Sequence, residues 1–187
     1  MKNLALIGIA LLISLTGNAQ EIKSRMDLRF GIGTSLLGTG DMRTIMFENE
    51  VNMKLNSYFS LSGGIGYAKS DYGVFEQASF VQLNANIYIS PFKNSRKNDF
   101  RIGTGPSWYS ISDVYQSSAS YQNGQLIDSE YEFDKRSSIG FNLIIENTYL
   151  IKEKYLLGLK LFTQPYQNGD INSGILIKWG IKIYNKA

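Results

Sequence analysis

The sequence predicts an all-β fold, an eight-stranded antiparallel up-and-down transmembrane β-barrel. Apolar and polar residues alternate with a period of two in eight segments, which is the pattern of half-buried strands. The polar positions of these segments carry mostly small side chains, and the connections between the segments are alternately short and longer. A chain of 187 residues is long enough for one such domain.

The first residues have the pattern of a secretory signal peptide. Lys2 supplies a positive charge, residues 4–15 form an apolar run, and Gly17 and Ala19 are the small residues that precede a cleavage point. This run is too short for a transmembrane helix, which takes about 20 residues. We therefore expect residues 1–19 to be removed and residues 20–187 to form the barrel domain.

Each of the eight segments has one apolar and one polar face. In the first segment, Leu28, Phe30 and Ile32 alternate with polar or small residues. An even number of strands of about ten residues is what a small membrane barrel needs. The predicted strands are residues 27–36, 47–55, 59–67, 81–90, 100–108, 138–149, 157–161 and 174–183.

The predicted connections differ in length on the two sides of the barrel. Short turns on one side and longer loops on the other are typical of an outer-membrane barrel with both termini in the periplasm. The short or compact connections lie around residues 56–57, 91–98 and 151–154. The longer ones are residues 38–43, 70–77, 113–136 and 165–172.

The polar face of the segments favours a membrane barrel over a soluble one. A soluble, lipocalin-like barrel would expose its polar face to water and would carry many long charged side chains there. Here that face is dominated by Gly, Ser and Asn, which fit a narrow interior. The apolar face carries large Leu, Ile and Phe residues and almost no charge, as lipid contact requires, because a charge at mid-bilayer costs about 2–4 kcal/mol.

Aromatic residues are expected to form two belts where the barrel meets the lipid headgroups. Those near the short turns are Tyr58, Phe59, Phe92, Phe100, Tyr149, Tyr155 and Tyr184. Those toward the longer loops are Phe47, Tyr67, Phe80, Trp108, Tyr109 and Phe162.

These features together resemble the small outer-membrane β-barrel proteins of Gram-negative bacteria, the OmpA/OmpX type. The resemblance covers residues 26–184 and rests on the signal peptide, the alternating strands, the Gly-rich polar face and the aromatic-bearing last strand. It implies a monomer in the outer membrane, in contact with lipid and inserted by the barrel-assembly machinery. Members of that family usually end on an aromatic residue, whereas here Tyr184 is followed by three more residues.

A row of charged residues falls on the inward face, and we interpret it as a lumen charge cluster. Counting from the turn near Glu153 places Glu146 opposite Lys160, and counting from Gly169 places Lys160 opposite Lys178. Glu48 and Glu50 are expected to meet Arg29 or Lys182. The row could be a static polar plug or a gate for ions. The cluster comprises Arg29, Glu48, Glu50, Arg101, Glu146, Lys160, Lys178 and Lys182, with Lys54 also inward.

The longest connection carries a second candidate site, a surface for contact with a partner. Its carboxylates recur every second residue and would share one face if the segment is extended. They could gather Ca²⁺, but no ligand-dense turn is visible, and we predict no metal site. A Ser/Gln-rich run, residues 116–125, would add to this surface. The contact residues are Tyr115, Tyr121, Asp128, Glu130, Tyr131, Glu132 and Asp134.

Composition argues against an enzyme. The chain has no His and no Cys, which removes Ser-His-Asp triads, thiolate chemistry and the commonest metal ligands. No Walker A, GxSxG or HExxH pattern occurs, and no cofactor is expected. The enzymes among small outer-membrane barrels, such as lipid A acylases and omptin-like proteases, use a catalytic histidine.

We therefore predict an outer-membrane barrel with a structural or surface-interaction role, a filled polar lumen and exposed extracellular loops. An extracellular protein or surface ligand is the expected partner, and the net charge of only +3 argues against nucleic acid. Two alternatives remain at this stage. One is a narrow porin-like channel for ions or small solutes, and the other is a soluble periplasmic ligand-binding barrel.

Overall fold

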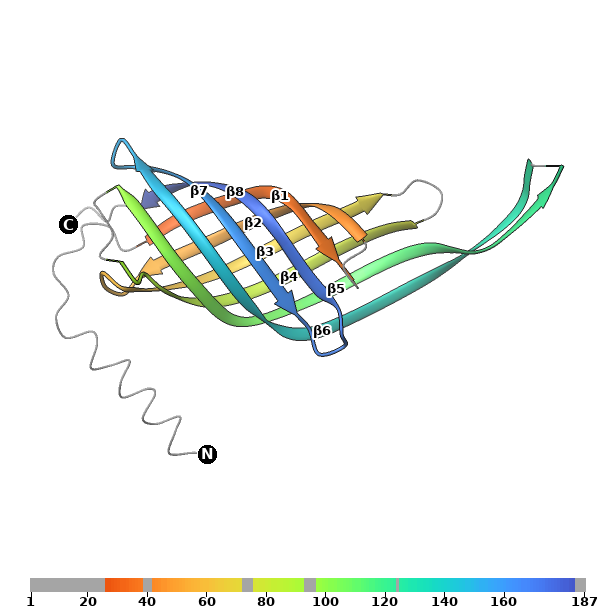
Figure 1. Cartoon of the computed structure of the whole chain (residues 1–187), viewed down its shortest axis with the longest axis horizontal. Coiled ribbons are helices and arrows are strands. Elements are labelled where there is room, and N and C mark those ends of the chain that lie inside the picture. The colour runs from red at the N-terminus through yellow and green to blue at the C-terminus, as the bar shows by residue number, and fades with distance from the viewer. Residues whose placement is uncertain (1–25, 39–41, 72–75, 93–96, 124, 184–187) are drawn as a thin grey trace, which may run out of the picture.

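The computed structural model describes residues 26–38, 42–71, 76–92, 97–123 and 125–183, which form eight strands (Figure 1). The expected signal peptide and Tyr184 lie outside these residues. The strands are β1 (Met26–Leu37), β2 (Met42–Lys54), β3 (Phe59–Asp71), β4 (Glu76–Ile89), β5 (Asn98–Gln122), β6 (Gln125–Ile151), β7 (Tyr155–Pro165) and β8 (Ile171–Ile183).

Each strand pairs antiparallel with its neighbours in the sequence, and β1 pairs antiparallel with β8 to close the ring. The closing register sets Phe30 beside Trp179, with their ring centroids 4.5 Å apart. The predicted eight-stranded up-and-down barrel is thereby confirmed. Among the described residues, no helix is long and apolar enough to cross a bilayer.

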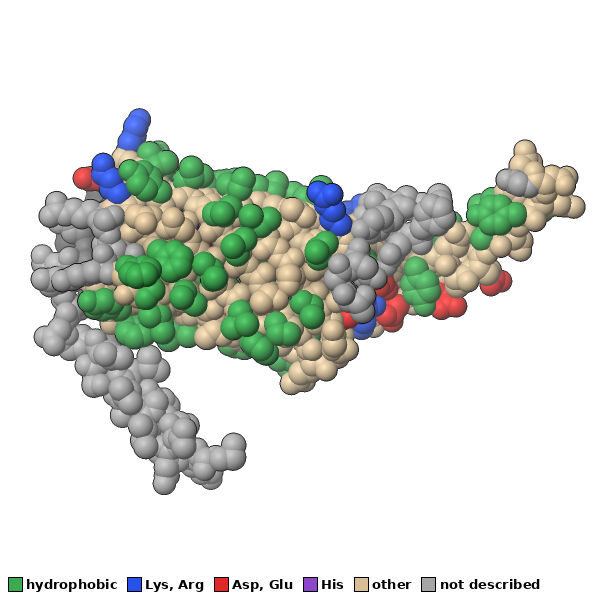
Figure 2. Space-filling model, viewed as in Figure 1, with side chains coloured by type: hydrophobic (Ala, Val, Ile, Leu, Met, Phe, Trp, Pro, Cys, Tyr) green, Lys and Arg blue, Asp and Glu red, His purple; other side chains and the backbone are tan. Residues whose placement is uncertain are grey.

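The outer wall of the barrel is apolar, and most of the side chains that point into the lumen are polar or charged. Ile65 and Leu83 point outward and are 50% and 49% exposed, whereas Glu48 and Arg101 point inward and are 1% and 0% exposed. Figure 2 shows hydrophobic side chains spread over the barrel wall. This arrangement is expected for a barrel wall in contact with lipid. The soluble alternative, with its apolar lumen, is wrong.

The predicted difference in connection length is also wrong. At the end of the barrel where Met26 and Ile183 lie, here called the turn end, the strands are joined by residues 55–58, 90–97 and 152–154. At the opposite end, the hairpin end, they are joined by residues 38–41, 72–75, 123–124 and 166–170. The two ends therefore differ in how far the strands project and not in loop length.

The segment 113–136, predicted as a loop, continues β5 and β6 beyond the barrel as a two-stranded hairpin (Figure 1). We call residues 115–134 the hairpin arm. The ladder continues because β-branched and aromatic residues still alternate with polar ones, so that Val114 pairs with Phe133 and Gln116 with Tyr131.

The aromatic belts form only in part. Phe47, Tyr67 and Trp108 are exposed on the outer wall toward the hairpin end, and Phe92, Phe100, Tyr149 and Tyr155 lie toward the turn end. The assignment of Phe80, Tyr109 and Phe162 to the outer belt is wrong, because all three are buried inside the barrel. Phe80 has the same strand parity as Gln82 and therefore points inward.

Candidate functional site

The lumen contains a charged layer of four cations and four carboxylates. Every one of these side chains is almost completely buried, and their formal charges cancel. The charged layer comprises Asp27, Arg29, Glu48, Glu50, Arg101, Glu146, Lys160 and Lys178.

Arg101 lies at the centre of the charged layer. Its Nη2 donates to Glu50 Oε1 and to Glu146 Oε1, each at 3.0 Å, and its Nη1 donates to Asn52 Oδ1 at 2.5 Å. The guanidinium stacks on the ring of Tyr88, 3.8 Å from the ring centroid. One arginine of β5 therefore joins side chains of β2, β4 and β6 across the lumen.

Arg29 forms the second centre of the layer. Its Nε donates to Asp27 Oδ1 at 2.5 Å, and its Nη1 donates to the carboxylate of Glu146 and to Thr148 Oγ1, the latter at 3.1 Å. Glu146 is thus shared by two arginines. The charge balance of the lumen therefore depends on this one buried carboxylate.

The two lysines bind the carboxylates of β2. Lys160 Nζ lies 2.8 Å from both carboxylate oxygens of Glu48. Lys178 Nζ lies 3.0 Å from Glu48 Oε1 and 2.8 Å from Glu50 Oε2. These contacts cross the barrel, since the lysines lie on β7 and β8.

The pairing expected from turn counting is only partly right. Glu146 does face Lys160 in the β6–β7 register. Lys160, however, faces Leu176 and not Lys178, so that expectation is wrong. The reason is that the β7–β8 connection is centred on Asn168, one residue before the position assumed, which shifts the register by two.

Glu48 and Glu50 were expected to meet Arg29 or Lys182, and this is partly right, because Glu50 faces Arg29 in the β1–β2 register. Their ion pairs, however, are with the two lysines of the charged layer and with Arg101. The register alone does not decide the contacts of long side chains, which reach beyond the neighbouring strand in a narrow lumen. Lys182 lies beside Asp27 in the β1–β8 register, close to the turn end.

Two inward carboxylates near the turn end were missing from the predicted cluster. Asp27 belongs to the charged layer, and Asp99 makes an ion pair with Lys54 at 2.8 Å. Asp27 occupies a polar position in the alternation of the first strand. The period-two pattern already contained the signal for it.

Next to the charged layer, amide side chains hydrogen-bond one another across the lumen. Gln164 Nε2 donates to Asn142 Oδ1 at 2.6 Å, and Asn172 Nδ2 donates to Gln164 Oε1 at 2.9 Å. Ser107 Oγ donates to Asn84 Oδ1 at 2.7 Å. These bonds join β4 to β5, and β6 to β7 and β8.

Toward the hairpin end the lumen is filled by apolar and aromatic side chains. Tyr109 packs between Phe80 and Tyr166, with ring centroids 5.3 and 4.3 Å away. This apolar plug was not expected from the small polar residues of the inward face. Its buried members include Leu37, Met42, Met46, Ala68, Ala78, Phe80, Tyr109, Ile111, Phe162, Tyr166 and Leu176.

The base of the hairpin arm is held by Arg136. Its Nη1 donates to Asp113 and to Asp134, each at 2.8 Å, and its Nε donates to Asp170 Oδ2 at 3.1 Å. Asp170 belongs to the β7–β8 connection and also accepts from Tyr109. We call these contacts of Arg136 the arm clasp, because they tie the arm to a neighbouring connection.

Removal of the arm clasp is expected to loosen the arm and leave the barrel intact. In Arg136→Gln, the three carboxylates lose their shared cation, and proteinase K should cleave the arm faster in detergent. Lys135→Gln is the matched control, because Lys135 is the exposed neighbour on the outward side of the same strand. Equal cleavage of both variants would show that the clasp does not position the arm.

The clasp is also expected to weaken in acid. Partial burial raises the pKa of Asp170, but hydrogen bonds from Tyr109, Asn168 and Arg136 outweigh it and hold the pKa below its ordinary value of 3.8. A depressed pKa stabilises the folded form fully above the ordinary value and loses that contribution as the pH falls below it. Cleavage of the arm by pepsin should rise in that range, and it should rise less in Arg136→Gln.

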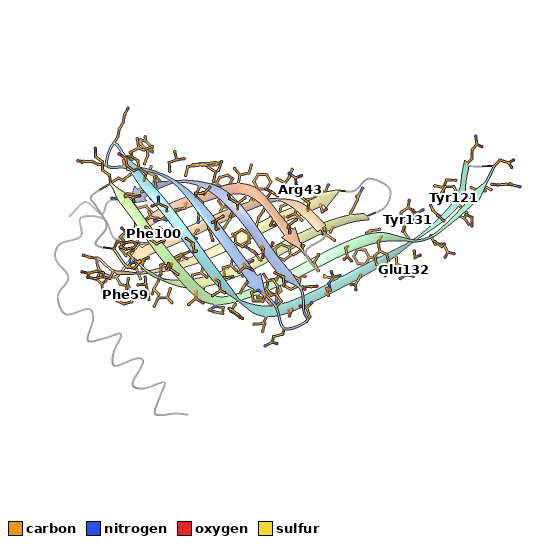
Figure 3. All side chains as sticks on the ribbon, viewed as in Figure 1. Arg43, Phe59, Phe100, Tyr121, Tyr131 and Glu132 are labelled. Carbon is orange, nitrogen blue, oxygen red and sulfur yellow. The ribbon has the colours of Figure 1, made fainter. Side chains whose placement is uncertain are left out.

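The predicted contact residues lie together on the hairpin arm, where Figure 3 labels Tyr121, Tyr131 and Glu132. Tyr121 is 62% and Tyr131 50% exposed. Tyr115 donates to Glu132 at 2.9 Å, and this hydrogen bond raises the pKa of the Tyr115 phenol.

The carboxylates of the arm follow one another along β6. Because the segment is a strand, Asp128, Glu130, Glu132 and Asp134 share one face of it. In the described part of the chain, no three carboxylates are placed to hold a metal ion. The Ca²⁺ interpretation therefore gains no support from the structure.

No known protein family and no curated protein matches this chain. Several solved structures share its fold. A major outer membrane protein of Thermus thermophilus is 10% identical, with 86% of this chain and 99% of that one covered at a TM-score of 0.62. Ail, the attachment invasion locus protein of Yersinia pestis, is 8% identical, with 87% and 100% covered at 0.60.

OprG, an outer membrane protein of Pseudomonas aeruginosa, is 8% identical, with 90% of this chain and 100% of that one covered at a TM-score of 0.55. Identities this low establish the architecture and not a shared activity. The ring of eight antiparallel strands, the apolar wall and these likenesses agree with one another. In its fold, the chain is a small eight-stranded outer-membrane β-barrel of the OmpA/OmpX type.

Proposed function

We propose that this protein is a surface-interaction protein of the outer membrane, in which the barrel is the anchor and the hairpin arm makes the contact. The observation that carries this proposal is the arm itself, a clasped two-stranded extension that projects from an otherwise compact barrel (Figure 1). The role involves no catalysis and no cofactor.

The exposed side chains of the arm support a binding role. Phe133 is 67% exposed, and Tyr121, Ile127 and Tyr131 are each at least half exposed. Large apolar groups gathered on a projection are typical of interaction sites. Tyrosine supplies contact area at low cost in conformational entropy.

The charge of the arm indicates the sign of its partner. Residues 115–134 contain four carboxylates and no Lys or Arg. Ail of Yersinia pestis has been crystallised with the heparin analogue sucrose octasulfate, a polyanion. The arm described here would repel such a ligand, so the partner we propose is neutral or cationic.

The closed lumen argues against the channel alternative. The charged layer, the amide side chains and the apolar plug fill successive levels of the barrel. We expect the purified protein in planar bilayers to show no stable conductance. Discrete nanosiemens openings would contradict this and favour a gate.

The proposal requires the arm to lie outside the cell, and the absence of Cys allows a clean test. Ser120→Cys on the arm should react with a membrane-impermeant maleimide on intact cells. Ser57→Cys, in an exposed turn at the opposite end, should react only after lysis. Labelling of Ser57→Cys alone on intact cells would overturn the proposed orientation.

Contact through the arm can be tested directly by photo-crosslinking on intact cells. A photoreactive residue at Tyr131 should give discrete adducts with a surface partner. The same residue at Tyr149, on the lipid-facing wall, should give none of them. If cells that expose the arm gave no adducts at either position, the interaction role would be contradicted.

A further inference from the structure

The hairpin arm has an open strand edge along β6. Between Gln125 and Ser138 this strand pairs with β5 on one side only, and its pairing with β7 begins at Leu143. In the described part of the chain, backbone groups of another segment contact this open side only at the base of the arm. There, Tyr166 bridges to Gly140, and the Gln167 amide donates to the Ile139 carbonyl at 3.0 Å.

The direction of the backbone groups along β6 can be assigned residue by residue. The Ile139 carbonyl points to the open side, because it accepts from the β7–β8 connection. The carbonyls of Glu130 and Asn142 point to β5, because they accept from the hydroxyls of Ser117 and Thr104. Since the direction alternates along a strand, the N–H and C=O groups of the odd-numbered residues 129–137 face the open side.

β5 offers a poorer edge than β6. Its pairing with β4 extends as far as Tyr115, and its ladder with β6 is irregular between Gln116 and Ser118. Such bulges bend a strand and blunt its edge. On β6, by contrast, residues 128–138 pair without a bulge on that strand.

The side chains along this edge specify the chemistry of an added strand. The even positions carry Asp128, Glu130, Glu132 and Asp134, whereas Tyr131 and Phe133 occupy the opposite face. Glu130 and Glu132 accept hydrogen bonds from hydroxyls, and Asp134 is neutralised by Arg136. A strand beside β6 therefore meets acidic groups on one face and aromatic groups on the other.

We propose that the β6 edge binds an extended segment of a partner protein in which basic and apolar residues alternate. The segment adds a strand through the free backbone groups. Its Lys or Arg residues lie across from the carboxylates, and its apolar residues pack on Tyr131 and Phe133. This inference rests on the proposed function and names the class of partner.

A second copy of the chain is a poorer occupant than such a segment. Two β6 edges joined to each other would bring the carboxylate rows of both arms onto the same face. Like charges on neighbouring strands are destabilising. The charge of the arm thus selects a basic segment and disfavours self-association along this edge.

The test uses the full barrel in detergent micelles and a short peptide of alternating Lys and Val. Two matched probes separate strand addition from simple charge attraction. One has the same composition with the Lys and Val residues in separate blocks, and the other is the alternating peptide with N-methylated backbone amides. The alternating peptide should bind about tenfold more tightly than either probe.

Variants of the arm locate the binding. Glu130→Gln with Glu132→Gln should weaken binding of the alternating peptide by about tenfold. Glu153→Gln, which removes one exposed carboxylate at the turn end, should leave binding unchanged. Heat-modifiable migration in gels shows whether each variant is folded, and the exposed positions should not disturb the barrel.

Two results would overturn the inference and leave the proposed function standing. One is equal binding of the alternating and block peptides, which would mean that charge alone acts. The other is tight binding by a variant in which residues 116–131 are replaced by an Asn-Gly turn. Failure of the arm to form adducts on intact cells would instead remove the proposed function itself.

Discussion

Glu146→Leu is expected to destabilise the barrel by about 3–5 kcal/mol, the usual cost of removing one partner of a buried ion pair. Glu146 is fully buried and bonds both Arg29 and Arg101, which would remain in the lumen with one negative charge too few. The measurement is urea unfolding in lipid vesicles, followed by tryptophan fluorescence.

The control for this prediction removes a pair without leaving a net charge. Lys160→Met alone should be strongly destabilising, because Glu48 loses a cation 2.8 Å away. Lys160→Met combined with Glu48→Met should recover much of the loss, since apolar replacement of a whole buried pair is often neutral. Equal losses in the single and double variants would contradict a lumen held by charge balance.

Gly105→Ala is expected to cost about 1–3 kcal/mol or more, as overpacking does in a well-packed interior. A Cβ at position 105 would lie 1.9 Å from the carbonyl oxygen of Ala85, and a backbone atom cannot yield without moving a strand. The β4–β5 register is interrupted at this point, beside Pro106, which has no N–H to donate. Unfolding in urea measures the loss.

Gly63→Ala is the matched control. Gly63 lies in β3, on the other side of β4, and faces outward, and a Cβ there would meet nothing within 4 Å. This variant should unfold at the same urea concentration as the parent protein, or slightly higher because of the reduced freedom of the unfolded chain. A loss as large as that of Gly105→Ala would mean that close approach to Ala85 is not the cause.

The barrel could be predicted from the sequence because its rule is local. A period of two decides which side chains share a face, and the size and polarity of each set decide which face meets lipid. The same rule places Asp27, Arg29 and Glu146 in the lumen. The errors at Phe80, Tyr109 and Phe162 came from treating aromatic residues as belt residues, although the strand parity placed Phe80 inside.

The contacts within the lumen could not be predicted, because they depend on distances between strands far apart in the sequence. A connection centred one residue earlier moves the register by two and separates Lys160 from Lys178. Long side chains also bind partners on strands that are not their neighbours, as Arg101 of β5 does with Glu50 of β2. No local pattern carries that information.

The sequence by itself determined a lipid-facing barrel with a charged, filled lumen and an acidic, aromatic segment between the fifth and sixth strands. Only the tertiary structure decided that this segment is a strand hairpin with an open edge. A strand can extend beyond the barrel only where a second strand pairs with it. Here β5 pairs with β6, for example at Gln116 and Tyr131. The arm, its clasp and its edge therefore follow from pairing between strands and not from the pattern of either strand alone.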